Sequence, residues 1–406
     1  MTRVGSGSRI FEQIVTITTS RLRRAHPLQG RGAMVARKLL PAVLGVASMT
    51  AAACAGEPSD PPQAYAYSEV KVDTRTPEAR KQYDANVAFA GAYVPKCTRS
   101  SAGRPRVMVT GFGRFMSIDD NASGRIVSKL VAGSVYPQTE SSPPGAVDAP
   151  GPQLNVVQAT VRLPRSGLVD VCAMILPVYW DLASILIAKE MDAFQPSFVM
   201  MNGVADARQP LWIELGATNR AEALEDGSNQ LRPVLGPNDS LAKIVDVGEE
   251  ARPNLLSWSA VTAAASGRVA AHANDVDADT RFGDVLDGVK LAGFPRSSNT
   301  YLCNNVTYVT SYLMAHPRAS VRLLRASPPL RNRINEVTVQ MKTDFSKTPR
   351  VFVHWPSELA TMHHAAGADV MAAILDAQLV AVSRGQAPTF GDNKLADPTL
   401  AGGKFF

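Results

Sequence analysis

The chain has 406 residues, of which 45% are hydrophobic and 19% are charged. This composition is ordinary for a globular protein and excludes disorder throughout the chain. The formal net charge of +6 arises at the N-terminus, because residues 1–40 hold eight basic residues against Glu12 alone and carry +7, which leaves −1 for the remainder. A nearly neutral body lacks the basic surface that a phosphate backbone requires, so we expect no nucleic-acid partner.

Residues 1–53 have the pattern of a basic leader followed by a signal-like segment. An uncharged apolar stretch from Leu39 to Met49 follows a basic flank and precedes small residues, and it is too short to span a bilayer comfortably. The run "AAAC" that ends at Cys54 is similar to a bacterial lipoprotein processing site. We therefore expect an exported protein, either periplasmic or anchored to the membrane as a lipoprotein through Cys54. A plain secretory signal cut near the alanines is the alternative.

The next segment, residues 54–100, is predicted to be a flexible tether, because its first half is rich in Pro, Ala and polar residues. In an exported protein Cys97 and Cys172 can form a disulfide that leaves Cys303 free, whereas two unpaired, half-buried thiols are the alternative. The sequence holds no close cluster of Cys and His residues, so we expect no metal site.

The body, residues 101–390, alternates short apolar runs with helical patterns. In chain order we predict a strand at 106–110, a helix at 121–133, a strand at 168–178, a helix at 181–194, a strand at 196–203, helices around 260–272 and after Cys303, a strand at 350–355 and a helix at about 363–383. This alternation implies parallel strands joined by crossover helices, which favours an α/β fold: a three-layer α/β/α sandwich with a mostly parallel central sheet. One domain then spans residues 101–390, with insertions at about 134–165 and 232–290 and a tail at 391–406. The first insertion, rich in Pro, Gly and Ser, is predicted to be a long loop.

Cys303 is a candidate nucleophile. It lies where a β-like run passes into a helical pattern, in "SNTYLCNNVTYVTSY". At the start of a helix, unpaired N–H groups and the positive end of the dipole would stabilise a thiolate and hold a developing oxyanion. A cysteine that only packs in the core is the more common situation at such a junction.

His354 and Glu214 are the candidate partners of this cysteine. His354 ends the apolar run "VFVHWP", and in an open parallel sheet the carboxyl ends of the strands carry the chemistry. An imidazole there can serve as the general base of a cysteine nucleophile, although a core histidine bonded to a carbonyl fits the same context. Glu214, in "LWIELGATN", can orient the imidazole and stabilise its charged form, with an exposed loop glutamate as the alternative.

Four stretches of the sequence match the motifs of one known family in the same order. The first match consists of Thr110, Gly111, Phe112, Phe115 and Asn121. The second consists of Gly203, Ala205, Arg208, Glu214, Ala217 and Asn219. The last two consist of Thr300, Cys303 and Asn304 and of His354, Trp355 and Pro356. Over most of residues 106–383 the chain thus resembles the pyroglutamyl peptidase I family of cysteine exopeptidases, which have an α/β/α fold and a Glu, Cys, His triad.

The resemblance implies removal of an N-terminal pyroglutamyl, or similarly blocked, residue from a peptide substrate. It implies that Cys303 is the nucleophile, His354 the general base and Glu214 the group that orients His354, with no cofactor. The implied substrate-binding residues are Phe112 and Phe115, which flank the lactam ring in the family, together with Asn121, Arg208, Asn219 and Thr300.

The chain departs from the family where pairs that contain glycine are replaced, at Met116–Ser117, Asp206–Ala207 and Ser298–Asn299. Each replacement adds side chains beside the implied pocket. Two alternatives therefore stay open: a related cysteine amidohydrolase that accepts a different acyl group, and a non-catalytic, surface-anchored binding protein on the same fold. No feature of the sequence indicates an oligomeric state.

Overall fold

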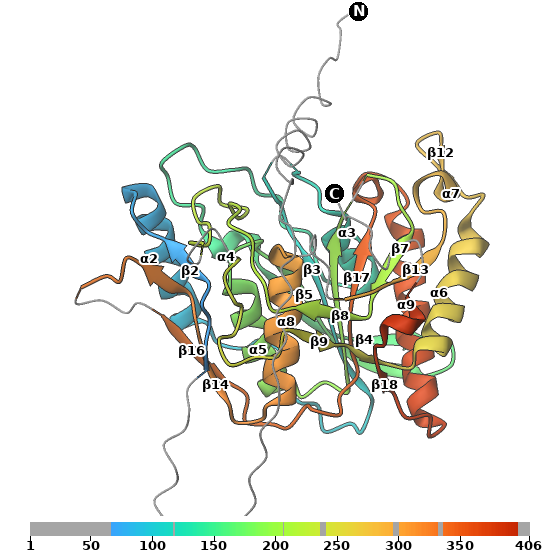
Figure 1. The fold of residues 1–406 in the computed structure, drawn as a ribbon. Helices are drawn as coiled ribbons and strands as arrows, with labels where there is room; N and C mark the ends of the chain where they lie inside the picture. Colours follow the sequence, from blue (N-terminus) through green and yellow to red (C-terminus); the bar gives the residue numbers. More distant parts are fainter. Residues whose placement is uncertain are drawn as a thin grey trace, which may run out of the picture. The chain divides into compact units, whose positions relative to one another are not determined.

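The structure is a computed structural model that describes residues 66–116, 118–205, 207–235, 241–294, 300–331 and 336–396 (Figure 1). Cys54, the whole leader and residues 397–406 of the tail lie outside the described residues. The predicted signal segment and lipidation site therefore stay predictions.

A mixed central sheet organises the described residues (Figure 1). Its principal strands are β3 (Arg106–Phe112), β4 (Asn155–Leu163), β5 (Gly167–Leu176), β6 (Phe198–Val204), β7 (Leu211–Glu214), β13 (Val289–Ala292) and β17 (Arg350–Trp355). They lie in the order β13-β7-β17-β6-β3-β5-β4. The four strands β17, β6, β3 and β5 are mutually parallel, whereas β7 and β4 pair antiparallel with β17 and β5, respectively. The sheet is thus parallel at its centre and antiparallel toward its edges.

The central strands are covered on both faces, as their nearly continuous apolar sequences require. In β3, Val107 and Val109 belong to one hydrophobic cluster, and Met108 and Phe112 belong to the other. The first cluster includes side chains of α3 (Ala122–Leu130), α6 (Trp258–His272) and α9 (His364–Ser383). The second includes side chains of α2 (Pro77–Ala92), α5 (Leu182–Phe194) and α8 (Leu302–Ala315). The predicted three-layer α/β/α sandwich is therefore confirmed.

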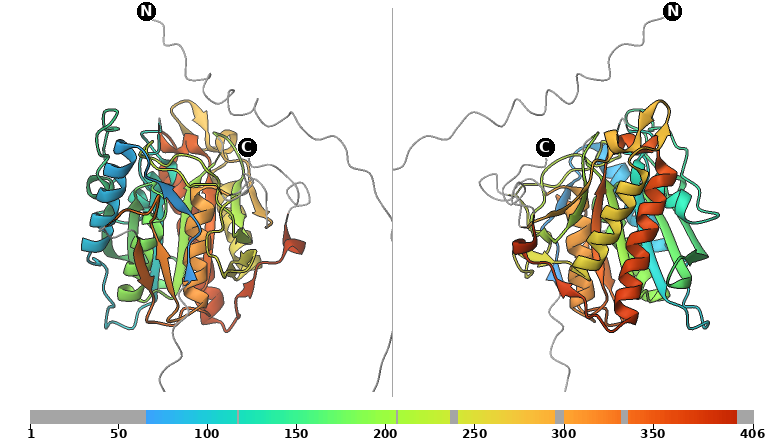
Figure 2. Two further views of the ribbon diagram at one scale, coloured as in Figure 1. Left: turned by 60° about the vertical axis from the view of Figure 1, so that its left-hand side comes forward. Right: turned by 90° about the vertical axis from the view of Figure 1, so that its right-hand side faces the viewer.

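The figures make the two helical layers visible. In Figure 1, α6 and α9 lie on one side of the central strands, and α2 and α5 lie on the other. The right-hand view of Figure 2 shows α6 (yellow) and α9 (red) packed side by side. By length and composition alone α9 could cross a membrane, but most of it is buried within the protein, so its apolar sequence is explained by a place in the core.

The prediction of a flexible tether is wrong for residues 66–100, because this segment packs into the body. The helix α2 begins after the N-cap Thr76, whose hydroxyl accepts a hydrogen bond from the Ala79 N–H. Its buried face includes two amides, Gln82 and Asn86, as well as apolar side chains. These buried polar residues weaken the apolar periodicity by which a sequence normally reveals a packed helix.

The first insertion is also more regular than predicted. A short helix, α4 (Pro150–Gln153), leads into β4, which pairs with the whole of β5 from Asn155↔Ile175 to Leu163↔Gly167. The side chains of β4 are mainly partly buried and exposed in turn, as expected for an edge strand with one covered face. Within this insertion, residues 134–149 are the part that forms neither helix nor strand.

The remaining elements are short and surround the sandwich. The second insertion contains α6, as predicted, and also contributes β9 (Ala251–Pro253), β10 (Leu255–Leu256), β11 (Val276–Asp277), β12 (Thr280–Arg281), α7 (Phe282–Val285) and the sheet strand β13. Elsewhere lie β1 (Ala66–Tyr67), β2 (Lys71–Asp73), β8 (Gly216–Thr218), β14 (Ser320–Leu323), β15 (Arg325–Ser327), β16 (Val337–Gln340), η2 (Ser357–Ala360), β18 (Thr389–Phe390) and η3 (Asn393–Leu395).

Cys97 and Cys172 form a disulfide, and Cys303 is free. The bond joins the segment after α2 to β5 and closes a sequence separation of 75 residues. Beside it, the Glu190 carboxylate of α5 accepts hydrogen bonds from the backbone N–H groups of Lys96 (2.7 Å) and Cys97 (2.9 Å). The two sulfurs and this carboxylate lie close together, but sulfurs in a disulfide are not the thiolates that bind metals.

Candidate active site

Three neighbouring strands bring two predicted catalytic residues together. His354 of β17 lies opposite Gly203 of β6 and opposite Trp212 of β7. Glu214 lies two residues beyond Trp212 and pairs with Phe352. Because side chains alternate along a strand, His354 and Glu214 share one face and stand diagonally across the antiparallel pair. Their strands therefore bring the two side chains within reach of each other.

The imidazole of His354 and the carboxylate of Glu214 are in direct contact, with 3.0 Å between Nδ1 and Oε1. The two side chains are only 7% and 0% exposed, respectively. Phe352 packs against the imidazole with its ring centroid 4.8 Å away, and the Asn254 side chain donates to the Glu214 carbonyl at 2.8 Å. A carboxylate held at Nδ1 fixes the ring orientation and leaves Nε2 on the opposite side, as a general base in a triad requires.

Cys303 lies in the first turn of α8, two residues after the N-cap Tyr301. The β-like run that was predicted to lead up to it is not a strand where it is described, since Tyr301 caps the helix and Leu302 is already helical. Residues 295–299 lie outside the described residues. The Cys303 side chain is partly buried and packs against the cluster that contains Phe352.

Gly203 explains how the sulfur fits against the sheet. A Cβ atom at this position would stand 2.8 Å from the Cys303 Sγ and 2.9 Å from the Phe352 ring, which is closer than real Cβ contacts. Only glycine therefore leaves room for the sulfur over β6. Because Gly203 is the strand neighbour of His354, sulfur and imidazole lie over adjacent strands on the same face of the sheet. The structure thus brings Cys303, His354 and Glu214 into one site.

Asn304 ties the first turn of α8 to the chain that follows Glu214. Its Oδ1 accepts a hydrogen bond from the Thr218 N–H at 2.8 Å, and its Nδ2 donates to the carbonyls of Thr218 and Arg220 at 2.8 and 2.9 Å. The side chain is fully buried. The resemblance included Asn304 without a role, and these bonds show that it holds the helix that carries Cys303 against β8.

The expectation of a stabilised thiolate at Cys303 is wrong for the structure as it stands. Burial raises the pKa of the Cys303 thiol above its ordinary value, and the nearby Glu214 carboxylate raises this pKa further. The backbone N–H of Cys303 lowers the pKa by less than these two effects raise it. The start of a helix thus does not outweigh burial beside a negative charge, and the resting thiol is neutral.

Aromatic rings lie beside the segment that carries Cys303. The ring of Tyr301 lies edge-on to those of Phe115 and Trp180, with centroid separations of 5.9 and 5.5 Å. Phe115 is thus near the start of α8, whereas Phe112 is 3% exposed and packs in the core at the end of β3. Contact of either ring with a substrate stays a prediction. Neither Trp180 nor Tyr301 is among the residues predicted from the sequence, although Tyr301 stands only two residues before Cys303.

The side chains of Asn121 and Asn219 form hydrogen bonds with backbone groups of their own chain. Asn121 is the N-cap of α3, and its Oδ1 accepts hydrogen bonds from the N–H and the hydroxyl of Ser123 at 3.1 and 2.7 Å. Asn219 accepts from the Val245 N–H at 2.9 Å and donates to the carbonyls of Val245 and Gly248 at 2.8 and 3.1 Å. These bonds give both buried side chains a structural role that the sequence analysis had not assigned.

Arg208 and Thr300 lie in different settings. The Arg208 guanidinium forms a 2.7 Å ion pair with Glu358 in η2, and the two side chains are 55% and 33% exposed. Thr300 is buried, and its backbone carbonyl accepts a hydrogen bond from the Glu222 N–H at 2.9 Å. Burial raises the pKa of the Glu222 carboxyl above its ordinary value. Contacts of Arg208 and Thr300 with a substrate stay predictions.

Met116 occupies a position where the family has glycine. Its φ of 49° lies in the left-handed region that favours glycine, so the backbone keeps a glycine-like conformation while it carries a large side chain. Of the other replaced positions, Ala207 is described, and its backbone carbonyl accepts a hydrogen bond from the Glu358 N–H at 3.2 Å. Ser117, Asp206 and residues 298–299 lie outside the described residues.

Comparisons with known proteins give matches among solved structures. Pyroglutamyl peptidase I from Bacillus amyloliquefaciens is 15% identical, and the match covers 68% of this chain and 97% of that one, with a TM-score of 0.40. Pyrrolidone carboxyl peptidase from Thermococcus litoralis is 15% identical over 69% and 96% of the two chains, with a TM-score of 0.42. A mutant pyrrolidone carboxyl peptidase from Pyrococcus furiosus is 16% identical over 68% and 98%, with a TM-score of 0.41. No family model and no curated protein matches the chain.

Proposed function

We propose that this protein is a cysteine peptidase that removes an N-terminal pyroglutamyl residue, or a similarly blocked residue, from peptides. The observation that carries the proposal is the buried 3.0 Å contact between His354 and Glu214, on the sheet face over which the Cys303 sulfur lies. A protein that only binds a partner has no need for a thiol, an imidazole and an orienting carboxylate in one place. The four motifs add the pyroglutamyl group as the proposed substrate.

The proposed reaction starts from a neutral thiol. As the Cys303 sulfur bonds to the carbonyl carbon of the scissile amide, the thiol proton passes to His354 Nε2, and the Glu214 carboxylate stabilises the imidazolium that forms. His354 then returns this proton to the leaving amine as the carbon–nitrogen bond breaks, which leaves a thioester on Cys303. Water attacks the thioester with His354 again as the base, and the acid product leaves while the thiol is restored.

The first turn of α8 is the proposed oxyanion site. The first N–H groups of an α-helix have no acceptor within the helix, and they point toward the side where the sulfur bonds the carbonyl carbon. Negative charge on that oxygen is also favoured by the positive end of the helix dipole. These groups supply the stabilisation without Arg208, whose guanidinium is paired with Glu358.

The direct test is turnover of a pyroglutamyl amide that releases a fluorescent amine. Wild-type protein is expected to release the amine, and Cys303→Ala is expected to release none above background. Asn305→Ala, a change two residues further along the same helix, controls for damage to α8. Undiminished turnover in Cys303→Ala would refute the assigned nucleophile.

The acyl group is tested separately, because the Met116 side chain occupies a glycine-like backbone position beside Phe115. A panel of N-acetyl, N-formyl and pyroglutamyl amides with one leaving amine compares the acyl groups directly. Preference for pyroglutamyl by tenfold or more supports the proposal, whereas a preference for another acyl group supports a related amidohydrolase.

The neutral thiol gives a second test that needs no substrate. Because the pKa of Cys303 is raised, its alkylation by iodoacetamide is expected to accelerate about tenfold per pH unit, and to keep rising beyond pH of about 8.5, where a free cysteine levels off. A plateau near neutral pH would instead show a preformed thiolate and would contradict the proposed proton transfer.

We also propose that the protein acts outside the cytoplasm. The disulfide between Cys97 and Cys172 supports this compartment, because such bonds persist mainly in oxidising surroundings. Membrane attachment through Cys54 is tested by metabolic labelling with a radioactive or clickable fatty acid. Labelling of the natural chain that disappears in Cys54→Ala is the expected result.

A further inference from the structure

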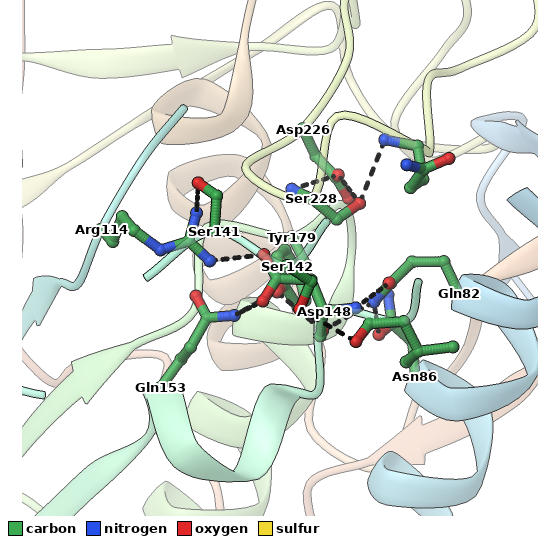
Figure 3. A network of polar contacts seen from close by, with 12 residues as sticks. Gln82, Asn86, Arg114, Ser141, Ser142, Asp148, Gln153, Tyr179, Asp226 and Ser228 are labelled. Carbon is green, nitrogen blue, oxygen red and sulfur yellow. Dashed lines mark hydrogen bonds and ion pairs between the residues drawn. The ribbon is translucent and has the colours of Figure 1, made fainter. Parts of the chain in front are cut away.

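Asp148, in the first insertion, lies at the centre of a buried polar network that the proposed mechanism does not use (Figure 3). Its carboxylate forms an ion pair with Arg114, whose side chain is fully buried, and accepts a hydrogen bond from the Gln153 side-chain amide Nε2 at 2.8 Å. Its backbone carbonyl accepts a hydrogen bond from the Tyr179 hydroxyl at 2.9 Å. Asp148 thus connects the loop after β3 with the segment between β5 and α5.

One connection leads to the loop that carries Phe115. Arg114 directly precedes Phe115, and besides its ion pair with Asp148 it donates to the Ser141 hydroxyl at 2.8 Å. A fully buried guanidinium is costly unless it is paired, so the place of Arg114 depends on this insertion. The position of the Phe115 ring is therefore set in part by residues that a compact member of the family would not have.

A second connection leads to the opposite side of Tyr301. Tyr179, which donates to Asp148, directly precedes Trp180, and the Trp180 ring lies edge-on to that of Tyr301. Tyr301 stands between the rings of Trp180 and Phe115, two residues before Cys303. Asp148 thus supports both aromatic rings that flank the N-cap of the nucleophile helix.

A third connection leads to the N-terminal segment. Gln82 of α2 accepts a hydrogen bond from the Asp148 N–H at 2.8 Å and donates to the Asp148 carbonyl at 2.9 Å. A second bond from the same amide nitrogen reaches Asn86 at 3.0 Å. Both amides are fully buried. Figure 3 labels them beside Asp148. The helix α2 therefore holds both the N–H and the carbonyl of Asp148 through the Gln82 side chain.

We propose that Asp148 is a positioning residue for substrate binding, and that α2 takes part in the site through it. The inference rests on the proposed function, since it concerns the binding of the acyl group beside Cys303. The side chain of Asp148 acts through Arg114 on Phe115, and this is the route that a substitution of Asp148 tests. The backbone carbonyl of Asp148 acts through Tyr179 on Trp180. Its loss should therefore weaken binding of the substrate more than the chemical step.

The test is steady-state kinetics of Asp148→Asn on the fluorogenic pyroglutamyl amide. We expect KM to rise about tenfold while kcat stays within about threefold, because the reacting groups stay in place. The rate of Cys303 alkylation by iodoacetamide should be unchanged. Asp376→Asn is the matched control, since Asp376 is another buried aspartate paired with an arginine, Arg165, and it should leave KM unchanged.

Gln82→Met keeps the inference testable if Asp148→Asn does not fold, because it preserves the ion pair and removes only the bonds from α2. It should raise KM about threefold. Arg114→Gln combined with Asp148→Asn should raise KM no further than either change alone, because the two act through one contact.

The outcomes separate this inference from the proposed function. If wild-type protein does not turn over the amide, the proposed function fails. If wild-type protein turns it over and the KM of Asp148→Asn and Gln82→Met matches that of wild type, the positioning role is refuted. A loss of kcat with unchanged KM would also refute it, since that result would place Asp148 in the chemical step.

Discussion

The strand face that carries His354 and the loops that were predicted to bind substrate differ in how their polar side chains are used. On the strands, His354 and Glu214 face each other across the sheet. In the loops, the amides of Asn121 and Asn219 are turned onto backbone groups of their own chain. Residues that share one motif can thus have different tasks: in the proposed mechanism some bear the chemistry, while others hold loops in place through backbone hydrogen bonds. Each prediction below either breaks this division or sharpens it.

The largest effect is expected on the strand face. His354→Ala removes the base and Glu214→Gln removes the charge that orients it, so kcat/KM should fall about 10³-fold or more in each. Thermal unfolding should show that both variants remain folded. Retention of more than a tenth of the wild-type kcat/KM in either variant would exclude that residue from the triad.

A loss of stability, with little change in activity, is expected in the loops. Asn219→Ala leaves the Val245 N–H and the carbonyls of Val245 and Gly248 without their bonds, which should lower the free energy of unfolding by about 2–4 kcal/mol. The folded variant should keep kcat/KM within about threefold of wild type. Urea unfolding measures the free energy of unfolding, and kinetics on the same sample measure kcat/KM. A tenfold loss of kcat/KM at unchanged stability would instead mean that Asn219 contacts the substrate.

A smaller effect is expected where the strand face meets the nucleophile helix. Gly203→Ala places a Cβ 2.8 Å from the Cys303 sulfur, so the sulfur must move and kcat should fall about tenfold to a hundredfold. Gly267→Ala in α6 is the matched control, because a Cβ there meets nothing within 4 Å. Equal kcat values for the two variants would contradict the position of the sulfur over β6.

The smallest effect is a change in how stability depends on pH. Burial raises the pKa of Asp226 to about 7, and hydrogen bonds from Ser228 and backbone N–H groups only partly oppose this. From about pH 4, where an exposed aspartate ionises, to about pH 7 the unfolded chain holds fewer protons at this site than the folded one. The free energy of unfolding should therefore fall as pH rises through this range, by at most ~1.4 kcal/mol per pH unit.

Asp226→Asn cannot ionise and should lose this slope. Chemical unfolding of both proteins at pH 5, 6, 7 and 8 provides the measurement. Parallel curves for variant and wild type would show that Asp226 ionises normally in the folded protein. The result also bears on the site, since the Asp226 carboxylate accepts a hydrogen bond from the backbone N–H of Trp180, whose ring contacts Tyr301.

The sequence was informative where burial and chemistry leave a local pattern. The apolar runs around Val107 and Phe352 and the alternation with helices predicted the layers correctly, because a sheet covered on both faces needs such runs. The same reasoning indicated His354, since a polar side chain that ends a buried strand requires an explanation. Glu214 was a candidate partner from its place after an apolar run, and the resemblance favoured it over an exposed loop glutamate.

Features that depend on distant partners could not be predicted in this way. The helix α2 was missed because Gln82 and Asn86 are buried by virtue of Asp148, which lies far along the chain. The raised pKa of the Cys303 thiol also depends on distant parts of the chain. The start of a helix predicts a lowered pKa, but burial and the Glu214 carboxylate raise it. The edge strand β4 was hidden by its Pro- and Gly-rich surroundings.

The base of the proposed reaction stands on an interior strand, paired on one side with β6 and on the other with β7. Such a strand cannot shift without breaking both of its ladders, so His354 cannot be withdrawn to silence the protein. Control of the proposed reaction is therefore expected at the access to the sulfur or at the start of α8. Search for regulation should concentrate on those two places.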